Sequence, residues 1–199
     1  MPKEIAYNAA EALAHRPDSD PYKRPAFSVG NRLRRVLWNL AWLLLCRFTP
    51  RPLHAWRAFV LRCFGARIAG PSFIYPTCTI WAPWNLVCAG HVTIGAHAEV
   101  YNPAPIHLGS HVILSQQSYL CGATHDYNDA AFPLLAYPMR LGAYAWVCAR
   151  ASVAPGVNLG EGAVLGLGAV ATRDLDPRSL YLGNPAVKIK DRMNPGSAV

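Results

Sequence analysis

The sequence predicts a mainly β fold, a parallel β-solenoid with a helical hairpin on its N-terminal side and a short C-terminal tail. Three observations support this prediction: a strict six-residue repeat over 141–175, a looser beat of the same length from residue 68, and two amphipathic segments within 31–64. A strand alternates with period two and a helix turns with period 3.6, so neither alone explains a period of six. A solenoid does, because each hexad supplies one flat side of a coil and points one aliphatic side chain inward.

The repeat is cleanest in the C-terminal half of the chain. Aliphatic residues hold its first position, namely Leu141, Val147, Val153, Leu159, Leu165 and Ala171. The fifth position is small or apolar throughout. These two positions predict the core of the solenoid.

The upstream beat is interrupted three times. It passes through Ile68, Ile74, Ile80, Leu86 and Val92, slips by two residues to Ile94 and Val100, and slips again around 102–105 to Leu108, Leu114 and Leu120. The clean phase then resumes only at Leu141, so about 15 residues leave the coil. Loops that leave a rigid scaffold often carry function, and this one contains His125 and Asp126.

The segment before the solenoid predicts two helices. The first covers 31–47, is capped by Ser28 or Asn31, and has an apolar face of Leu33, Val36, Leu37, Leu40 and Leu44. The second begins at Thr49 as cap with Pro50 at its first position, and Arg57 and Arg62 oppose its apolar face. Two interpretations stay open: the hairpin covers the open end of the solenoid, or it lies on anionic lipid with Trp38, Trp42 and Trp56 at the interface.

Charge and composition narrow the class of partner. The net charge is +8, and no acidic residue occurs between Asp20 and Glu99, whereas ten Lys and Arg residues do. An anionic membrane face or a phosphate-bearing substrate fits this field better than nucleic acid, because no nucleic-acid-binding motif accompanies it. No apolar run is long enough to span a bilayer, no signal peptide is visible, and the six cysteines lack CxxC pairing, so we expect free thiols in the cytoplasm.

These patterns divide the chain into four parts. They are an arm over 1–30, a basic amphipathic helical hairpin over 31–64, a β-solenoid domain over 65–185 with an excursion loop over 121–140, and a tail over 186–199.

Several motifs carry a resemblance to a known family. The hexad tandem, with NPAPIHLG, CGATHDY, WVCARASVAPGV and LGNPAVKIK, resembles the hexapeptide-repeat acyltransferases. Within them it looks most like the acetyltransferases of colanic-acid-type exopolysaccharide biosynthesis, which are relatives of the maltose and galactoside O-acetyltransferases. The resemblance implies a left-handed parallel β-helix, a homotrimer with sites between neighbouring copies, acetyl-CoA as donor, and a sugar hydroxyl as acceptor. Many such acceptors are carried on lipid diphosphates, which would place the enzyme at the inner face of the cytoplasmic membrane.

The resemblance also implies site residues. His125 matches the loop histidine that acts as general base, and Asn102 matches the asparagine that contacts the acceptor. The residues that match the coenzyme A cleft are Trp146, Ala149 through its backbone N–H, Gly166, Arg173, Pro185 and Lys188. Relatives often carry Ser where Ala149 stands, and the acidic acceptor-binding residue of the galactoside enzymes has no clear counterpart here.

The residues themselves support part of this assignment. A sugar hydroxyl is protonated at neutral pH, and histidine has the pKa that suits its removal. Asp126 could orient the ring of His125 or only form a turn, and Asn102 could contact an acceptor or only start the turn before Pro103. Arg173 would form a basic rim with Lys188, Lys190 and Arg192 that suits an anionic cofactor.

Other functions remain open at this point. One is an N- or O-acyltransferase for a nucleotide sugar or serine, and another is a non-catalytic β-helix that serves as a scaffold or binds metal. No metal is expected, because the spacings of His91, His97, His107 and His111 do not match three converging imidazoles.

Overall fold

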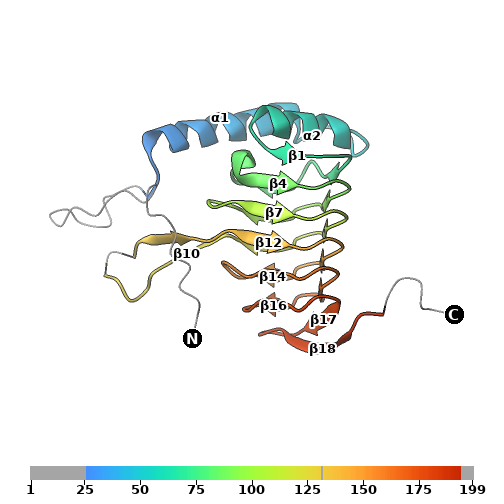
Figure 1. The fold of residues 1–199 in the computed structure, drawn as a ribbon. Coiled ribbons are helices and arrows are strands. Elements are labelled where there is room, and N and C mark those ends of the chain that lie inside the picture. The colour runs from blue at the N-terminus through green and yellow to red at the C-terminus, as the bar shows by residue number, and fades with distance from the viewer. Residues whose placement is uncertain (1–25, 131, 194–199) are drawn as a thin grey trace.

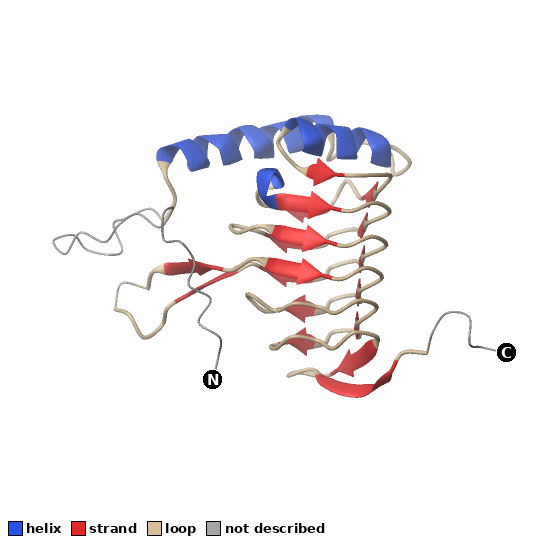
Figure 2. Ribbon diagram, in the orientation of Figure 1, coloured by secondary structure: helices blue, strands red, loops and turns tan. Residues whose placement is uncertain are grey.

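The computed structural model describes residues 26–130 and 132–193 of the 199-residue chain. A parallel β-helix is covered at its N-terminal end by two α-helices that lie across it (Figure 1; Figure 2). Most of the predicted arm, including His15, lies outside the described residues.

The walls of the β-helix are three sheets. Sheet A contains β1 (Arg67–Ile68), β4 (Leu86–Cys88), β7 (Ile106–Leu108) and β12 (Met139–Leu141). Sheet B contains β2 (Phe73–Ile74), β5 (Thr93–Ile94), β8 (Ile113–Leu114), β13 (Trp146–Val147), β15 (Val164–Leu165), β17 (Ser179–Leu182) and β18 (Val187–Asp191). Sheet C contains β3 (Thr79–Ile80), β6 (Glu99–Tyr101), β9 (Tyr119–Cys121), β14 (Ser152–Val153) and β16 (Val170–Ala171). The chain passes from A to B to C in each coil, and we name the turns between them the A/B, B/C and C/A corners.

The number of coils can be counted along sheet A, where each coil places one inward-facing residue beside that of the next coil. Six residues pair in parallel in this way, so the β-helix has six coils: Ile68, Cys88, Leu108, Leu141, Leu159 and Leu175. In Figure 1 the strands of the front sheet, β4, β7 and β12, run one way. Strands β14 and β16, which belong to the sheet at the back and to lower coils, run the other way. Because the chain descends from coil to coil in this view, the coil is left-handed. The predicted left-handed parallel β-helix is confirmed.

The hexad has a simple physical origin. The second residue of most two-residue strands is buried and the first faces out, so one aliphatic side chain per side fills the interior. The glycine that often follows it is required by the neighbouring coil: a Cβ built on Gly142 would lie 2.6 Å from the backbone nitrogen of Glu161. The repeat therefore records both the core and the tight spacing of the corners.

The first phase slip lies elsewhere than the sequence predicts. Cys88 pairs with Ile68, so the two extra residues enter before β4, where Pro83–Asn85 forms a turn of 3-10 helix, and not after Val92. The pattern is ambiguous here because Leu86 and Val92 are also fully buried. Six-residue counting therefore reached buried positions in the wrong register.

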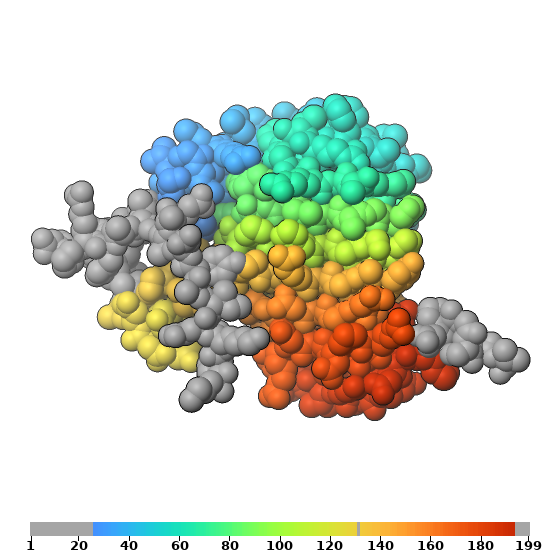
Figure 3. Space-filling model, in the orientation of Figure 1, coloured from blue at the N-terminus to red at the C-terminus, as the bar shows by residue number. Residues whose placement is uncertain are grey.

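The other two interruptions lie where the sequence predicts them. Sheet C pairs Val100 with Leu120, and sheet A pairs Cys88 with Leu108, so the second slip falls at 101–107. The long excursion is an antiparallel hairpin of β10 (Ala123–His125) and β11 (Leu134–Ala136). It projects from the C/A corner and stands clear of the coil in the space-filling view (Figure 1; Figure 3).

Two helices form the cap. Helix α1 spans Val29–Leu45, with the Ser28 side chain accepting a hydrogen bond from the N–H of Asn31, and α2 spans His54–Cys63. The predicted start of the second helix is wrong, because Thr49 does not cap it. Its hydroxyl donates instead to the carbonyl of Cys46, and the segment up to α2 consists of turns.

The orientation of α1 also differs from expectation. Its coil side is aromatic and basic: Trp38 is 1% exposed and its Nε1 donates to the carbonyl of Ile80 at 2.7 Å. Trp42 packs against Trp38, so of the three tryptophans predicted at a lipid interface only Trp56 is exposed. The predicted apolar face points to solvent, and its five residues are between 51% and 70% exposed.

A buried arginine ties the cap to the coil. Arg57 was expected on the solvent side of α2, but it has no exposed surface. Its guanidinium donates to the Ile74 carbonyl at 2.6 Å, to the Thr49 hydroxyl at 2.7 Å and to the carbonyls of Pro50 and Arg51. Burial lowers the pKa of Arg57. The helices therefore cover the end of the solenoid, as one of the two interpretations proposed.

Neither described helix has the length and hydropathy that a membrane span requires. All six cysteines are free, and burial raises the pKa of the Cys78 and Cys88 thiols to about 12.

The C-terminal end of the coil is closed differently. Strand β18 runs antiparallel to β17, and all its residues are exposed. The predicted tail therefore contributes a strand before the described residues end at Met193.

Candidate active site

His125 ends β10 and is exposed on the projecting hairpin. Its Nδ1 lies 2.6 Å from the carbonyl oxygen of Phe132, on the opposite side of the hairpin. A carbonyl can only accept, so in the neutral ring Nδ1 carries the proton and Nε2 keeps its lone pair. The hairpin therefore holds His125 in the tautomer that a general base needs.

Asp126 does not orient this ring. Its carboxylate accepts a hydrogen bond from the N–H of Asn128 at 3.0 Å, and its own N–H donates to the Pro133 carbonyl. This is the turn-forming role that the sequence left open. The orienting group is the Phe132 carbonyl, which no side-chain motif could indicate.

Asn102 lies inside the coil and has no exposed surface. Its amide oxygen accepts from the N–H of Ala82 at 2.9 Å, and its amide nitrogen donates to the carbonyl of the same residue at 2.8 Å. These bonds hold the turn after β6 against the preceding coil. Contact between Asn102 and an acceptor would require this turn to open, so the geometry gives it a structural role in place of the predicted one.

Four of the predicted cofactor residues lie along the B/C side. Trp146 faces outward on β13, is 40% exposed, and donates from Nε1 to the Ser115 hydroxyl at 2.8 Å. The corner after it contains Ala149, the corner one coil below contains Gly166, and Pro185 follows β17 in the last coil. These residues therefore lie on the same side of the solenoid, with Gly166 aligned below Cys148 and Ala149 aligned above Leu167.

Ala149 offers an unused backbone donor. Among the described residues its N–H donates to no protein acceptor, while its carbonyl accepts from the N–H of Gly168 at 3.0 Å. The same corner position in the first coil is Pro76, which has no N–H. The coil therefore does not need this N–H, and it is free for a ligand.

Gly166 lies close to the coil below. A Cβ at this position would contact the end of the Leu182 side chain, which is exposed, and would lie 3.2 Å from the carbonyl oxygen of Tyr181. Glycine therefore fits this close approach without displacing the Leu182 side chain.

The two predicted basic residues, Arg173 and Lys188, differ in whether their charge is already paired with a carboxylate. Arg173 is exposed near the end of sheet C. Lys188 is held by two carboxylates, with Nζ 2.9 Å from Asp191 and 3.5 Å from Asp176. The hydrogen bond to Asp191 raises the pKa of Lys188, and its charge is already compensated. Of the two, Arg173 is the better placed to meet an anion.

A hollow of about 530 Å³ lies on the same side of the coil, above Trp146. Its lining includes Arg51, Tyr75, His97, Ser115 and Gln116. Arg51 donates to the Tyr75 hydroxyl at 2.8 Å. The sequence interpretation missed these residues, although aligning the hexads of adjacent coils would place Ser115 directly above Cys148.

Comparison with known proteins identifies the family of this chain. The chain is 35% identical over 167 residues to WcaF of Escherichia coli, which is named as a colanic acid biosynthesis acetyltransferase, and the match covers 84% of this chain and 92% of that protein. The chain belongs to the WcaF family of acetyltransferases. A scan against protein-family models found none that matches.

Solved structures share the fold of this WcaF family member. A hexapeptide-repeat acetyltransferase from Vibrio cholerae superposes with a TM-score of 0.76 at 20% identity, covering 84% of this chain and 95% of the other. The same protein was also solved with acetyl-CoA, at a TM-score of 0.71, 18% identity and coverage of 84% and 91%. A maltose O-acetyltransferase from Clostridium difficile 630 gives 0.71 at 21% identity, covering 84% and 90%. At these identities the likeness establishes the fold alone.

The WcaF-type chain does not assemble its predicted residues at one place. His125 projects from the C/A corner, whereas Trp146, Ala149, Gly166 and Pro185 lie on the B/C side. No hydrogen bond or ring contact among the described residues joins the two groups. Among the same residues, no three His, Cys, Asp or Glu side chains come close enough to hold a metal ion.

Proposed function

We propose that this chain transfers acetyl from acetyl-CoA to a hydroxyl of a carbohydrate acceptor in exopolysaccharide biosynthesis of the colanic acid type. The observation that carries the proposal is the tautomer of His125, whose Nδ1 is bound to the Phe132 carbonyl and whose Nε2, on an exposed hairpin, has no hydrogen-bond partner among the described residues. The WcaF relationship supports the pathway, and the fold shared with sugar acetyltransferases supports the acceptor class.

In this proposal His125 moves one proton. Nε2 accepts it from the acceptor hydroxyl while that oxygen attacks the thioester carbonyl carbon, and then donates it to the sulfur as the carbon–sulfur bond breaks. The products are the acetyl ester and the free thiol, so the proton and the leaving group balance. The Phe132 carbonyl stabilises the protonated ring through Nδ1.

The N–H of Ala149 is the donor that we assign to the thioester oxygen as it gains negative charge. A backbone N–H that is fixed by the coil needs no reorganisation during the reaction. Trp146 provides an outward ring beside it, and Arg173 provides an uncompensated positive charge for the phosphates of coenzyme A. No step requires a metal.

The separation of the two groups supports a shared site in a homotrimer. In a cyclic oligomer one surface of each copy meets a different surface of its neighbour. The hairpin of one copy can then meet the B/C side of the next, which brings Nε2 of His125 to the N–H of Ala149.

We also propose that the enzyme works in the cytoplasm. Its six free cysteines fit a reducing compartment. The acceptor that we propose is a sugar carried on a lipid diphosphate, since the basic N-terminal half would attract its charge.

The test measures release of free thiol from acetyl-CoA with a panel of sugar acceptors. We expect His125→Gln to lower kcat by about 10²–10⁴-fold, because it removes the base. Ala149→Pro should lower kcat by about 10²-fold or more, since it removes only the free N–H. Both variants should keep the melting temperature, since His125 is exposed on the hairpin and proline already occupies, at Pro76, the corner position equivalent to Ala149.

Matched controls separate chemistry from folding. Ala149→Gly keeps the N–H and should retain turnover, and His91→Gln changes a histidine at the A/B corner, away from the site. Unchanged turnover in His125→Gln would remove the proposed base. Absence of turnover by the wild type with every acceptor in the panel would favour a non-catalytic β-helix. A product that resists mild alkali would be an amide, which would overturn the O-acetyl assignment in favour of an N-acyltransferase.

A further inference from the structure

Helix α1 has two apolar sides that point in opposite directions. Trp38 packs onto the coil and is 1% exposed, whereas Leu40 is 51% exposed. At 100° per residue these two positions are about 160° apart around the helix. The aliphatic stripe therefore lies opposite the packed side, and nothing in the described chain covers it.

The stripe continues into a larger surface, which we name the cap face. On α1 and just after it, the cap face contains Val29, Leu33, Val36, Leu37, Leu40, Leu43, Leu44 and Phe48, and on the α2 side it contains Leu53, Trp56 and Phe59. Each of these side chains is between 39% and 84% exposed. Single exposed apolar residues are normal on soluble proteins, but a contiguous surface of this kind marks an interaction site.

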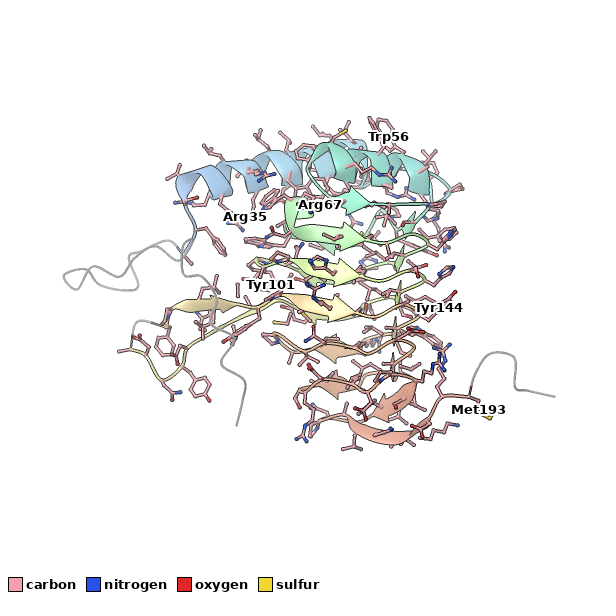
Figure 4. The ribbon with its side chains drawn as sticks, viewed as in Figure 1. Arg35, Trp56, Arg67, Tyr101, Tyr144 and Met193 are labelled. Carbon is pink, nitrogen blue, oxygen red and sulfur yellow. The ribbon has the colours of Figure 1, made fainter. Side chains whose placement is uncertain are left out.

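The position of the cap face suits a flat partner. Both helices lie side by side across the end of the coil, and Trp56 points away from the coil while Arg35 lies beneath α1 (Figure 4). A helix of 17 residues is about 25 Å long, so the cap face is an elongated plane and not a pocket.

The charge around the cap face has one sign. Between residues 26 and 98 the charged side chains are eight arginines, with no aspartate, glutamate or lysine. Arg32 is exposed beside the stripe, and Arg47 follows α1. Apolar side chains on one face with cationic residues at the rim are the pattern of helices that lie in the interface of anionic membranes.

We propose that the cap face docks on the surface of an anionic phospholipid bilayer, with α1 and α2 lying in the membrane plane and the β-helix standing away from it. The aliphatic side chains would enter the boundary between headgroups and acyl chains, and Arg32 and Arg47 would meet lipid phosphates. This assignment stands apart from the acetyl-transfer chemistry, because none of its residues belongs to the proposed active site.

The charge argues against a second copy as the occupant. Two cap faces in a twofold contact would bring arginines against arginines without a described acidic partner. A bilayer with anionic lipids supplies the opposite charge and the apolar phase together.

The experiment is flotation of the full-length protein with vesicles. One set of vesicles contains phosphatidylcholine with about a third of phosphatidylglycerol, and the other contains phosphatidylcholine alone. We expect binding to the anionic vesicles that weakens as salt is raised, because the arginine contribution is screened.

Two double variants isolate the cap face. Leu40→Gln/Leu44→Gln should weaken binding to anionic vesicles by about tenfold or more, since it removes apolar surface that would be buried in the bilayer and keeps helix-forming residues. The matched control is Ile189→Gln/Met193→Gln, which changes two equally exposed apolar residues at the other end of the molecule and should bind as the wild type. Unchanged melting temperatures and acetyl-CoA turnover in both variants show that folding and chemistry are intact.

Three results would overturn the proposal. The first is that the wild-type protein does not float with anionic vesicles. The second is that both double variants lose vesicle binding equally. The third is that the wild type forms an oligomer without vesicles and that Leu40→Gln/Leu44→Gln, but not the control variant, fails to form it. The last would identify a second copy as the occupant. Turnover is measured separately, so failure of membrane docking leaves the acetyltransferase proposal untouched.

Discussion

The coil and the cap use the same kinds of residue in opposite ways. In the coil, aliphatic side chains at the hexad positions face inward, and Leu114, Leu120 and Leu165 have no exposed surface. In the cap, the leucines of α1 face outward, while Arg57 and Trp38 are buried. A periodic pattern therefore shows which residues share a face, but not which way that face points.

The two regions also differ in how completely their polar groups are satisfied. Beneath α1, the buried atoms Arg35 Nε and Trp42 Nε1 have no hydrogen-bond partner among the described residues. Buried polar atoms without partners cost about 1–3 kcal/mol each. Asn31 Oδ1 is the third such atom and also lies on α1, so among the described residues the polar groups of the cap are less completely satisfied than those of the coil.

The largest effect is expected at Arg57. Arg57→Met removes the donor to the Thr49 hydroxyl and to the carbonyls of Pro50 and Arg51, and one of the two partners of the Ile74 carbonyl, so we expect a loss of about 3–5 kcal/mol in the free energy of unfolding. Urea unfolding measures it. Arg62→Met is the matched control, since Arg62 is exposed and donates only to the Ile68 carbonyl, and it should cost less than about 1 kcal/mol. Equal effects would mean that Arg57 does not anchor the cap.

A leucine pair tests the comparison directly. Leu114→Ala should cost about 3 kcal/mol, because it opens a cavity in the coil. Leu40→Ala should stay within about 0.5 kcal/mol, because the side chain is exposed and alanine favours helix. A substantial loss in Leu40→Ala, measured by urea unfolding without lipid, would show that the cap face is covered within the protein itself.

The smallest effect is a pH dependence at His107. Burial, followed by the charges of Arg140 and Arg67, lowers the pKa of His107 below its ordinary value of 6.5. The unfolded chain then binds a proton before the folded chain does, so this residue's contribution to stability is fully present above pH 6.5 and is lost as pH falls below it. In His107→Gln that part of the pH dependence should vanish. Parallel stability curves for both proteins between about pH 5 and 7.5 would contradict it.

Much of the fold could be predicted, because each coil repeats the same constraint. Leu141, Val147 and Val153 occupy equivalent inward positions, so spacing alone located them. The first phase slip was misplaced because Leu86 is buried although it is out of register with Ile68. The direction of α1 could not be predicted, because aromatic and aliphatic sides both qualify as apolar.

The site was predictable only where a side chain carries the chemistry. His125 stands out as a histidine in an excursion from the coil, and its tautomer then depends on the backbone carbonyl of Phe132. The N–H of Ala149 is likewise a backbone group, so residue type gives no signal for it. Asn102 shows the reverse case, in which a polar side chain that suggests a substrate contact is used to hold a turn.

Strand β18 affects whether copies of the protein could stack end to end into a fibre. A parallel coil ends in an edge that could accept the first coil of another copy, and repetition of that contact would build a fibre. The chain reverses direction at β18, so the last edge no longer matches the parallel register of a following coil. Lys188, Lys190 and Asp191 also line the reversed strand with charge. With helices at one end and this strand on sheet B at the other, end-to-end stacking of parallel coils is disfavoured at both ends.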